Sequence, residues 1–206
     1  MASRPPVASM VRYNDGIIAV VDKPFGLPTQ RARSGGVNLY DLLRREFGYV
    51  GLHHRLDTPA SGLLVVALRK NANAGLAQSF REHAVRRRYR AAVLGSPPDA
   101  GRWTQSLDSK PAVTHFRVAV RGDGLCVLQV ELETGRTHQI RRHAAGAGLP
   151  LLGDRRHGGA AGRLWKRLAL HAEHLAFDHP VTGERIEVQS PVPDDLKPLL
   201  TEARRA

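Results

Sequence analysis

The sequence predicts an α+β fold with a mixed, mainly antiparallel sheet flanked by helices, and three observations support this class. Short apolar runs typical of buried strands occur among segments whose apolar residues recur at helical spacing. Two strand-like runs are joined by Arg121-Gly122-Asp123-Gly124, which is typical of a hairpin turn. Hairpins and helices are mixed rather than strictly alternating, which disfavours a wholly parallel α/β sheet.

The chain of 206 residues is long enough to bury one good core. It has no internal repeat and no linker rich in proline and serine, so we expect a single domain over residues 11–206. Residues 1–10 contain no apolar stretch and are expected to form a short disordered lead.

The first half of the chain is expected to hold two strands and two helices. The runs at residues 17–21 and 63–68 are continuously apolar, which predicts buried strands. Asn38 is expected to cap a helix that ends at Gly48. Asn71 is expected to cap a second helix, because small and apolar residues recur after it at helical spacing.

The second half is expected to contain more strands than helices, separated by turns rich in glycine and proline. The expected elements are strands at residues 89–94, 112–121 and 125–134, a helix at 137–145, strands at 168–177 and 185–188, and a short helix opened by Pro193.

The chain is strongly cationic, with 31 Lys and Arg against 19 Asp and Glu and a formal net charge of +12. Nearly all the cations are arginines, whose planar guanidinium pairs bidentately with phosphate and stacks on bases. A genome rich in G and C would explain arginine in place of lysine, but it would not explain the surplus of charge. We therefore expect a nucleic acid as the partner.

The single cysteine, Cys126, lies in an apolar strand-like run and is expected to be a reduced core residue. No apolar run approaches the roughly 18 to 20 residues needed to cross a bilayer. The first residues also lack the apolar stretch of a signal peptide. We expect no membrane association and a cytoplasmic location, with a monomer as the default state.

Asp57 is the first candidate functional residue. The segment His54-Arg55-Leu56-Asp57 is followed by turn-forming residues up to Gly62 and then by a predicted buried strand. This order predicts that Asp57 lies near the rim of the sheet, where catalytic residues often lie. Arg55 would lie on the same side of an extended loop and influence the charge state of Asp57. The alternative is a structural aspartate that caps a turn or pairs with an arginine.

The segment from Thr134 to Arg141 is the second candidate. Thr137 is expected to cap the following helix, and the early N–H groups together with Arg136 would make its entrance favourable for an anion. Arg141 lies one turn into this helix and is expected to reach a carboxylate such as Asp57. The alternative is an ordinary capped helix with solvated arginines.

The third candidate is the basic cluster Arg86-Arg87-Arg88, which leads into Tyr89 at the head of a predicted strand. This pattern suits a surface that holds a nucleic-acid backbone while an aromatic ring stacks on a base. A single tyrosine in a strand is more often part of the core, so the pattern is weak by itself.

Metal and nucleotide sites are not expected. The 10 histidines have no cysteine partner, no HExxH motif and no carboxylate-rich spacing, so they are expected to contact RNA or to pack against strands. The sequence also lacks a Walker loop, a GxGxxG motif and the GxSxG context of a hydrolase nucleophile.

Four segments together resemble the RluA-type pseudouridine synthase family, in the order of that family and over most of the chain. They are the strand and loop from Tyr13 to Pro28, the segment from His54 to Gly62, Arg88-Tyr89, and the segment from Thr134 to Arg141 with Gly153-Asp154. The resemblance implies the α+β catalytic domain of that family, with a central cleft. It also implies an RNA uridine isomerase that needs no cofactor and no metal.

The resemblance assigns roles to the matching residues. Asp57 would break the glycosidic bond of the target uridine, either by attack on C1′ or by removal of the C2′ proton. Tyr89 would stack on the extruded base, Arg141 would pair with Asp57, and Ile140 would supply an apolar wall. Arg55 would occupy the gap left when the uridine leaves the stack, or contact the rearranged loop. The other expected RNA contacts are His54, Arg136, His138, Arg86, Arg87, Arg88 and Lys23.

The sequence departs from the family at Pro59-Ala60, where the family usually has threonine in the second position, so the loop is expected to be stiffer. No RNA-binding domain is expected before Tyr13, so the basic surface of the catalytic domain or a partner would select the target, a ribosomal or transfer RNA. Two other classes of function are the alternatives. A non-catalytic RNA-binding or chaperone module has no need of the aimed carboxylate, and a nuclease would need metal-binding carboxylates.

Overall fold

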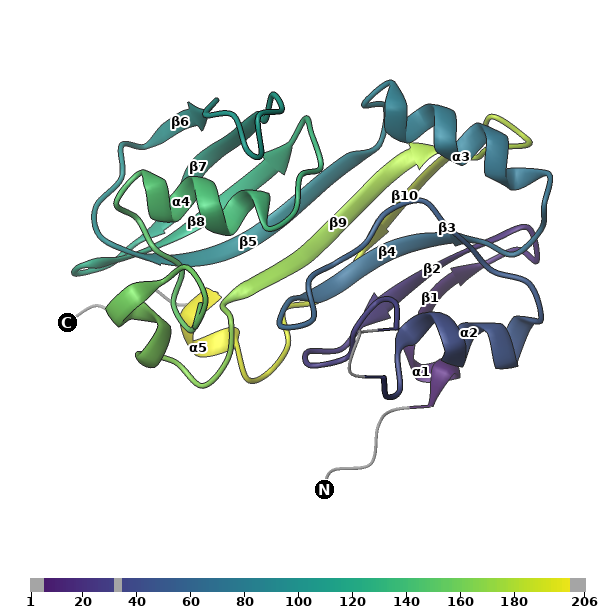
Figure 1. Cartoon of the computed structure of the whole chain (residues 1–206), viewed down its shortest axis with the longest axis horizontal. Helices are drawn as coiled ribbons and strands as arrows, with labels where there is room; N and C mark the ends of the chain where they lie inside the picture. The colour runs from purple at the N-terminus through teal and green to yellow at the C-terminus, as the bar shows by residue number, and fades with distance from the viewer. Residues whose placement is uncertain (1–5, 32–34, 201–206) are drawn as a thin grey trace. The chain divides into compact units, whose positions relative to one another are not determined.

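The computed structural model describes residues 6–31 and 35–200 of the protein. The chain forms two compact units, each of which contains two segments of the sequence. Unit 1 comprises Met1–Val85 and His174–Ser190, and unit 2 comprises Arg86–Glu173 and Pro191–Ala206. Figure 1 labels the helices and strands of both units.

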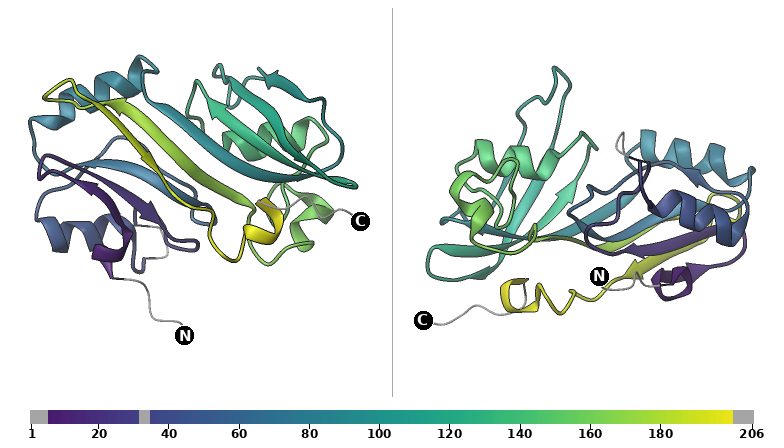
Figure 2. Two further views of the ribbon diagram at one scale, coloured as in Figure 1. Left: turned by 180° about the vertical axis from the view of Figure 1, so that it is seen from behind. Right: turned by 60° about the horizontal axis from the view of Figure 1, so that its bottom comes forward.

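Unit 1 is built on a sheet whose strand order is β1-β2-β4-β9-β10, with β3 paired to β4. The pairs β1–β2, β2–β4, β3–β4 and β9–β10 are antiparallel. Every residue of β4 is buried, which explains its continuously apolar sequence. Figure 2 shows β10 beside β9 in the view from behind. The strands are β1 (Val11–Asn14), β2 (Ile18–Lys23), β3 (Gly51–Leu52), β4 (Ser61–Ala67), β10 (Arg185–Gln189) and the part of β9 (Leu170–Asp178) that begins at His174.

The helices of unit 1 are α1 (Val7–Met10), α2 (Leu39–Phe47) and α3 (Ala72–Arg81). The predicted cap of α2 is confirmed, because Asn38 Oδ1 accepts a hydrogen bond from the Asp41 N–H at 3.0 Å. Its predicted end is also confirmed, since Gly48 adopts φ +77° and a left-handed turn suits glycine. The second predicted cap is wrong in its mechanism: the Asn71 side chain makes no capping bond to α3.

The core of unit 1 lies between the sheet and α3. Ala72 and Leu76 of α3 pack with Leu63 and Val65 of β4 and with Phe177 of β9, and all five are buried. The small residues of α3 therefore bring its backbone close to the apolar face of the sheet. This packing holds β4 in place, and β4 begins directly after the candidate loop around Asp57.

Unit 2 is built on a second antiparallel series, in which β5 is followed by β8, β7 and β6. The predicted hairpin turn is confirmed, because Arg121 pairs with Cys126 and the Gly122 N–H donates to the Leu125 carbonyl at 2.8 Å. Cys126 is buried, as predicted. The elements of unit 2 are β5 (Arg86–Leu94), β6 (Ala100–Trp103), β7 (Thr114–Arg121), β8 (Leu125–Leu132), α4 (Gln139–Gly146), the short helix η1 (Gly159–Arg163) and α5 (Lys197–Leu200).

Helices α4 and α5 lie on opposite faces of the unit 2 strands (Figure 2). On the face toward α4, the Gln139 side chain donates to Thr114 Oγ1 at 2.9 Å, and His143 Nδ1 lies 2.9 Å from the same oxygen. On the other face, Arg90 donates to the Leu200 carbonyl at 3.0 Å. Side chains of α4 therefore bond to β7 on one face of these strands, and β5 bonds to α5 on the other.

Three strands were not predicted, and all are short: β1, β3 and β6. β1 has a half-buried, half-exposed alternation without an apolar run, β3 has only the residues Gly51 and Leu52, and β6 has the sequence Ala-Gly-Arg-Trp. Pairing with β2, β4 and β7 produces these strands, rather than their own propensity. The expected disordered lead is wrong for Val7–Met10, which form α1 with Met10 buried. Residues 1–5 of that lead lie outside the described residues.

Helix α4 begins two residues later than predicted. The residue before its first turn is His138, in a left-handed conformation with φ +54°, and Thr137 is exposed. Gln139 explains the difference, because its Oε1 accepts from the Arg136 N–H at 2.9 Å and from the Thr134 hydroxyl at 2.8 Å. The Gln139 side chain therefore fixes the turn that precedes α4, and the helix begins after that turn.

Candidate active site

Asp57 lies in the loop that leads into β4. Its side chain is partly buried, Leu56 before it is buried, and Arg55 is exposed. The backbone turns directly after it, since the Ala60 N–H donates to the Asp57 carbonyl at 3.0 Å. Pro59 lies inside this turn, where its fixed φ stiffens the backbone. The carboxylate is thus presented by a short, tight turn at the start of a buried strand.

The buried side chain of Lys23 fixes this turn by hydrogen bonds. Its side chain is 0% exposed, and its Nζ donates to the carbonyl of Ala60 at 2.6 Å, with a longer 3.4 Å contact to the carbonyl of Thr58. It also donates to the carbonyls of Pro24 at 3.0 Å and Leu27 at 2.9 Å. The expected RNA contact by Lys23 is therefore wrong, because a buried ammonium that serves backbone carbonyls cannot reach a phosphate.

Thr29 holds the other side of the loop. Its hydroxyl donates to the Leu56 carbonyl at 2.8 Å and accepts from the Leu56 N–H at 3.2 Å. Gly26, with φ +77°, donates its N–H to the Thr58 carbonyl at 2.9 Å. Residues 23–29 therefore bond to the residues on both sides of Asp57. Thr29 was not predicted, and it directly follows the segment from Tyr13 to Pro28 that carries the first part of the resemblance.

His54 faces the interior of unit 1 more than an RNA. Its Nε2 accepts a hydrogen bond from the Val65 N–H at 2.9 Å, which places the ring proton on Nδ1. Its ring also stacks on Phe80 of α3, with centroids 4.6 Å apart. The imidazole thus ties the loop before Asp57 to β4 and to α3, which is a structural role.

Tyr89 and the basic cluster occupy alternate faces of β5. Tyr89 is 6% exposed, and Arg87 on the same face is buried, with its guanidinium donating to the carbonyls of Leu132 and Thr134 at 3.3 and 3.4 Å. The expected contact of Arg87 with RNA stays a prediction. Arg88, on the other face, pairs with Glu173 at 3.1 Å. Arg86 is the exposed member of the cluster.

Arg141 is held by a buried ion pair with Asp154. Its Nε donates to Asp154 Oδ2 at 2.9 Å and its Nη2 donates to Oδ1 at 2.6 Å, with the two side chains 4% and 1% exposed. Burial alone would raise the pKa of Asp154, but bonds from Arg141 and from the N–H groups of His157 and Arg156 hold that pKa below its ordinary value. The geometry is bidentate and fixes the plane of the guanidinium.

The entrance of α4 carries the other predicted residues of unit 2. Ile140 is buried, and Arg136 donates through Nε to the Pro111 carbonyl at 2.9 Å. His138 Nδ1 lies 2.8 Å from His157 Nε2, so one ring donates to the other. Burial is the main cause that lowers the pKa of His157, and nearby arginines add to it, while Asp154 opposes it. The role of His157 was not predicted.

The structure thus brings the predicted residues together in two groups. In unit 1, His54 and Arg55 lie in the same loop as Asp57, and Lys23 at the end of β2 bonds to the Ala60 carbonyl of that loop. In unit 2, α4 brings Ile140 and Arg141 close to the turn that contains Asp154, and β5 carries Tyr89. The predicted pairing of Arg141 with Asp57 stays a prediction.

The described residues offer neither a cluster of metal ligands nor a membrane-spanning helix. Among residues 6–31 and 35–200, no three His, Cys, Asp or Glu side chains gather in a way that would hold a metal ion. Within the same residues, no helix is both long enough and apolar enough to pass through a membrane.

Comparisons with known proteins are consistent with this arrangement. The family model described as RNA pseudouridylate synthase matches residues 17–146. The chain is 36% identical to ribosomal large subunit pseudouridine synthase D of Xanthomonas campestris pv. campestris, over 94% of this chain and 69% of that protein. It is 35% identical to the protein of the same name from Neisseria meningitidis serogroup A, over 97% of this chain and 62% of that protein.

A solved structure is also similar. Human RNA pseudouridylate synthase domain containing 1 superposes with a TM-score of 0.77 at 26% identity, covering 92% of this chain and 86% of that one. The fold is therefore shared over nearly the whole length of the chain. The curated relatives are longer, since the chain spans from 62% to 69% of the two bacterial proteins.

Proposed function

The chain belongs to the RNA pseudouridylate synthase family, and from this premise we propose which residues isomerise the uridine and which RNA carries it. The protein is an RNA pseudouridine synthase, which is an isomerase. The predicted family, fold class and enzyme class are thereby confirmed.

The reaction needs one well-placed group and access to both edges of the base. The N1–C1′ bond of uridine breaks, the uracil rotates, and a C5–C1′ bond forms. The proton on C5 leaves and N1 gains a proton, so substrate and product contain the same atoms. Neither C1′ nor C5 can be reached inside a stacked helix, so the uridine must be extruded first.

We propose that Asp57 is the group that opens the glycosidic bond, as nucleophile at C1′ or as base at C2′. The observation that carries this proposal is the set of buried bonds around its loop. Lys23 bonds to the Ala60 carbonyl after Asp57, and Thr29 bonds twice to Leu56 before it. A catalytic carboxylate must be held within a fraction of an ångström of its productive position, and such bonds supply that precision.

Tyr89, Ile140 and Arg141 are proposed to serve the same uridine. Tyr89 presents a ring suited to stacking on the extruded base, and Ile140 offers an apolar wall. Arg141 is proposed to favour the charged form of Asp57, with Asp154 fixing the direction of its guanidinium. Arg55 and Arg86 are exposed and are proposed to contact RNA, together with Arg136 and His138 at the α4 entrance.

The proposed substrate is large-subunit ribosomal RNA. The support comes from the names of the two bacterial relatives, which act on the large ribosomal subunit, and from the net charge of +12. A transfer RNA is the alternative substrate in the same class. Consistent with such a substrate, we propose that the protein is a monomer in the cytoplasm.

The experiment that tests the function uses unmodified transcripts of bacterial 23S ribosomal RNA and of transfer RNAs. The purified protein is incubated with each transcript, and pseudouridine is mapped by a carbodiimide adduct that stops reverse transcription. We expect one new stop in the ribosomal transcript. A stop only in transfer RNA would change the assigned substrate from ribosomal to transfer RNA. The absence of a stop in every transcript would contradict the proposed function.

The same mapping in cells with and without the gene identifies the natural uridine. A binding-only module is not proposed, because no described feature favours it. Such a module would not need a carboxylate loop fastened by a fully buried lysine.

A further inference from the structure

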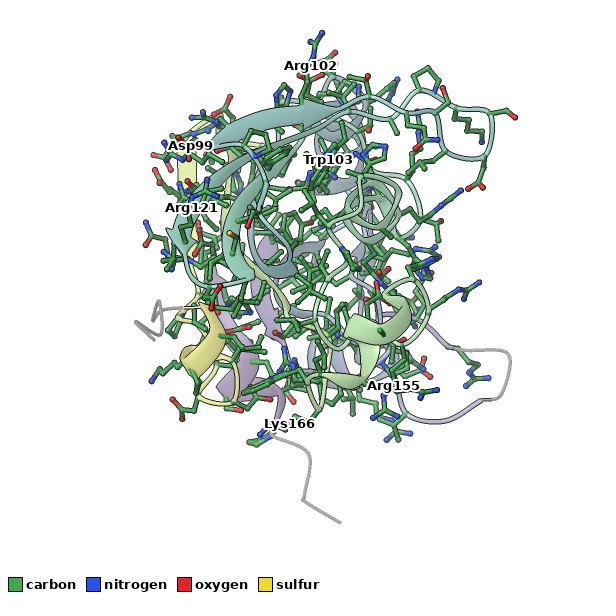
Figure 3. All side chains as sticks on the ribbon, turned by 90° about the vertical axis from the view of Figure 1, so that its left-hand side faces the viewer. Asp99, Arg102, Trp103, Arg121, Arg155 and Lys166 are labelled. Carbon is green, nitrogen blue, oxygen red and sulfur yellow. The ribbon has the colours of Figure 1, made fainter. Side chains whose placement is uncertain are left out.

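Unit 2 carries a loop of exposed cations that the isomerisation does not use. Between Asp154 and Arg167, the side chains of Arg155, Arg156, Arg163 and Lys166 are all exposed, and residues 155–166 contain no Asp or Glu. Figure 3 labels Arg155 and Lys166 near the short helix η1, with nitrogen atoms at the surface. We call residues 155–166 the basic loop.

The cations of the basic loop have no partner within the described part of the chain. The ion pairs and hydrogen bonds of the described residues include none from the side chains of Arg155, Arg156, Arg163 or Lys166. Arg167, directly after the loop, provides a contrast, because it is buried and its Nη1 lies 3.2 Å from both oxygens of Asp195. The chain thus pairs a cation where the fold needs it and leaves the loop cations unpaired.

Hydrogen bonds and close packing also fix the backbone of the basic loop. Asp154 Oδ1 accepts from the N–H groups of Arg156 and His157, both at 3.1 Å, which fixes the first turn. Gly158 and Gly162 pack against the Asp154 backbone so closely that an added Cβ would lie 2.5 and 2.6 Å from its carbonyl oxygen. At the far end of the loop, Trp165 packs on the core of unit 2. The cations are therefore presented on a fixed frame.

Asp154 connects the basic loop to the proposed active site. The carboxylate that fixes the first turn of the basic loop also forms the bidentate pair with Arg141. A ligand held by the loop would therefore be held in a constant relation to Arg141. Clustered like charges repel one another and lower the stability of the folded state, so an unpaired cluster on a fixed frame favours an anionic ligand.

We propose that the basic loop binds the phosphates of the substrate RNA, as a docking surface separate from the residues that touch the target uridine. The proposal rests on the proposed function for the identity of the anion, and it deepens that function by naming a surface. RNA phosphates are the occupant that fits, because arginine pairs with phosphate in a planar, bidentate geometry. Each phosphate contact releases counterions, which makes its contribution measurable through salt.

The test compares two variants that lose the same charge. The first carries Arg155→Gln, Arg156→Gln, Arg163→Gln and Lys166→Gln in the basic loop. The matched control carries Arg45→Gln, Arg69→Gln, Lys70→Gln and Arg81→Gln in unit 1, where these four cations are likewise exposed. The affinity of each protein for a fluorescein-labelled hairpin of 23S ribosomal RNA is measured between 50 and 300 mM salt. Circular dichroism and urea unfolding confirm that both variants fold.

For the loop variant, we expect the slope of log affinity against log salt to become less steep by about 3, which corresponds to roughly 0.7 to 0.9 for each lost phosphate contact. The control is expected to change the slope by less than about 1. Equal slopes for wild type and loop variant, or equal losses in both variants, would overturn the proposal. If the quadruple variant does not fold, Arg155→Gln and Lys166→Gln are tested singly, each with an expected loss of about 0.7 to 0.9.

Pseudouridine formation is measured on the same preparations, which separates the two proposals. If the wild type forms pseudouridine and the loop variant keeps the wild-type salt slope, the proposed function is supported and the proposed docking surface is overturned. If the wild type forms no pseudouridine but the salt slopes are as expected, the RNA-binding surface is supported and the proposed function is overturned. An acidic protein partner in place of RNA would appear as a loop variant with the RNA slope of the wild type.

Discussion

Lys23 Nζ donates a hydrogen bond to the Ala60 carbonyl at 2.6 Å, so a fully buried ammonium fastens the turn that presents Asp57. The same nitrogen bonds to the Leu27 carbonyl at 2.9 Å, in the loop that follows β2. One charge therefore connects two loops of unit 1. The position of the proposed catalytic carboxylate depends on a residue that does not itself reach the substrate.

Replacing Lys23 by methionine is expected to destabilise the protein and to lower its activity. The substitution keeps most of the side-chain volume but leaves buried carbonyls without their donor, at a cost of about 1 to 3 kcal/mol. Urea unfolding measures the stability, and single-turnover pseudouridine formation measures the rate. Lys70→Met, at an exposed site, is the control. Unchanged stability and rate in Lys23→Met would contradict the assigned role.

Replacing Thr29 by valine is expected to lower the rate of the chemical step more than the affinity for RNA. Valine has the shape of threonine but removes both bonds to Leu56, at 2.8 and 3.2 Å, so the loop before Asp57 loses a fixed contact. The measurement is the single-turnover rate beside the dissociation constant for the RNA hairpin. Thr29→Ser keeps the hydroxyl and is expected to retain most of the rate. Equal rates in the valine and serine variants would refute this role.

Replacing Asp154 by asparagine is expected to destabilise the protein by about 3 to 5 kcal/mol, because it leaves the buried Arg141 guanidinium without its ionic partner. The folded state lowers the pKa of Asp154, so its contribution is complete above the ordinary pKa near 4. That contribution is lost as pH falls through the lower folded value. The stability of the wild type should therefore fall in acid, and the stability of the variant should fall less over the same pH range.

Urea midpoints between pH 3 and pH 7 measure this difference, with Asp123→Asn in the exposed β7–β8 turn as the control. The control is expected to follow the wild type. An Asp154→Asn protein with the wild-type acid dependence would show that the ion pair contributes nothing through ionisation.

Protonation of His157 is expected to loosen the entrance of α4. Its pKa is lowered in the folded state, chiefly by burial, so the unfolded chain binds the proton more readily. Stability from this group is complete above the ordinary pKa near 6.5 and is lost as pH falls below it. His157→Asn should therefore lose less stability than wild type between pH 7 and pH 5. His83→Asn, at an exposed left-handed position that asparagine tolerates, is the control.

Much of the fold could be predicted because its signals are local. The apolar run at 63–68, the Asn38 cap and the turn at 121–124 each lie within a few residues, and each was found at its place in the structure. The strands β1 and β6 depend on pairing with distant strands, so their own sequences predict little.

The residues of the site also divide into those that local sequence predicts and those that depend on distant contacts. Asp57 and Arg141 lie in local motifs, but Lys23 looks like an RNA contact until its burial is known. Alternation along β5 could have indicated that Arg87 shares the buried face of Tyr89, since strand residues two apart point the same way. The bonds from Thr29 to Leu56 span 27 residues, and no local pattern predicts them.

The most direct test of the account is the single-turnover formation of pseudouridine in a 23S ribosomal RNA transcript by wild type, Asp57→Asn and Asp99→Asn. Asp99 is an exposed aspartate in unit 2 and serves as the matched control. We expect Asp57→Asn to fold, to bind the RNA hairpin with the wild-type salt dependence, and to lose at least about 1,000-fold in rate. Asp99→Asn should retain the wild-type rate. An Asp57→Asn enzyme that forms pseudouridine at the wild-type rate would show that Asp57 is not the catalytic carboxylate.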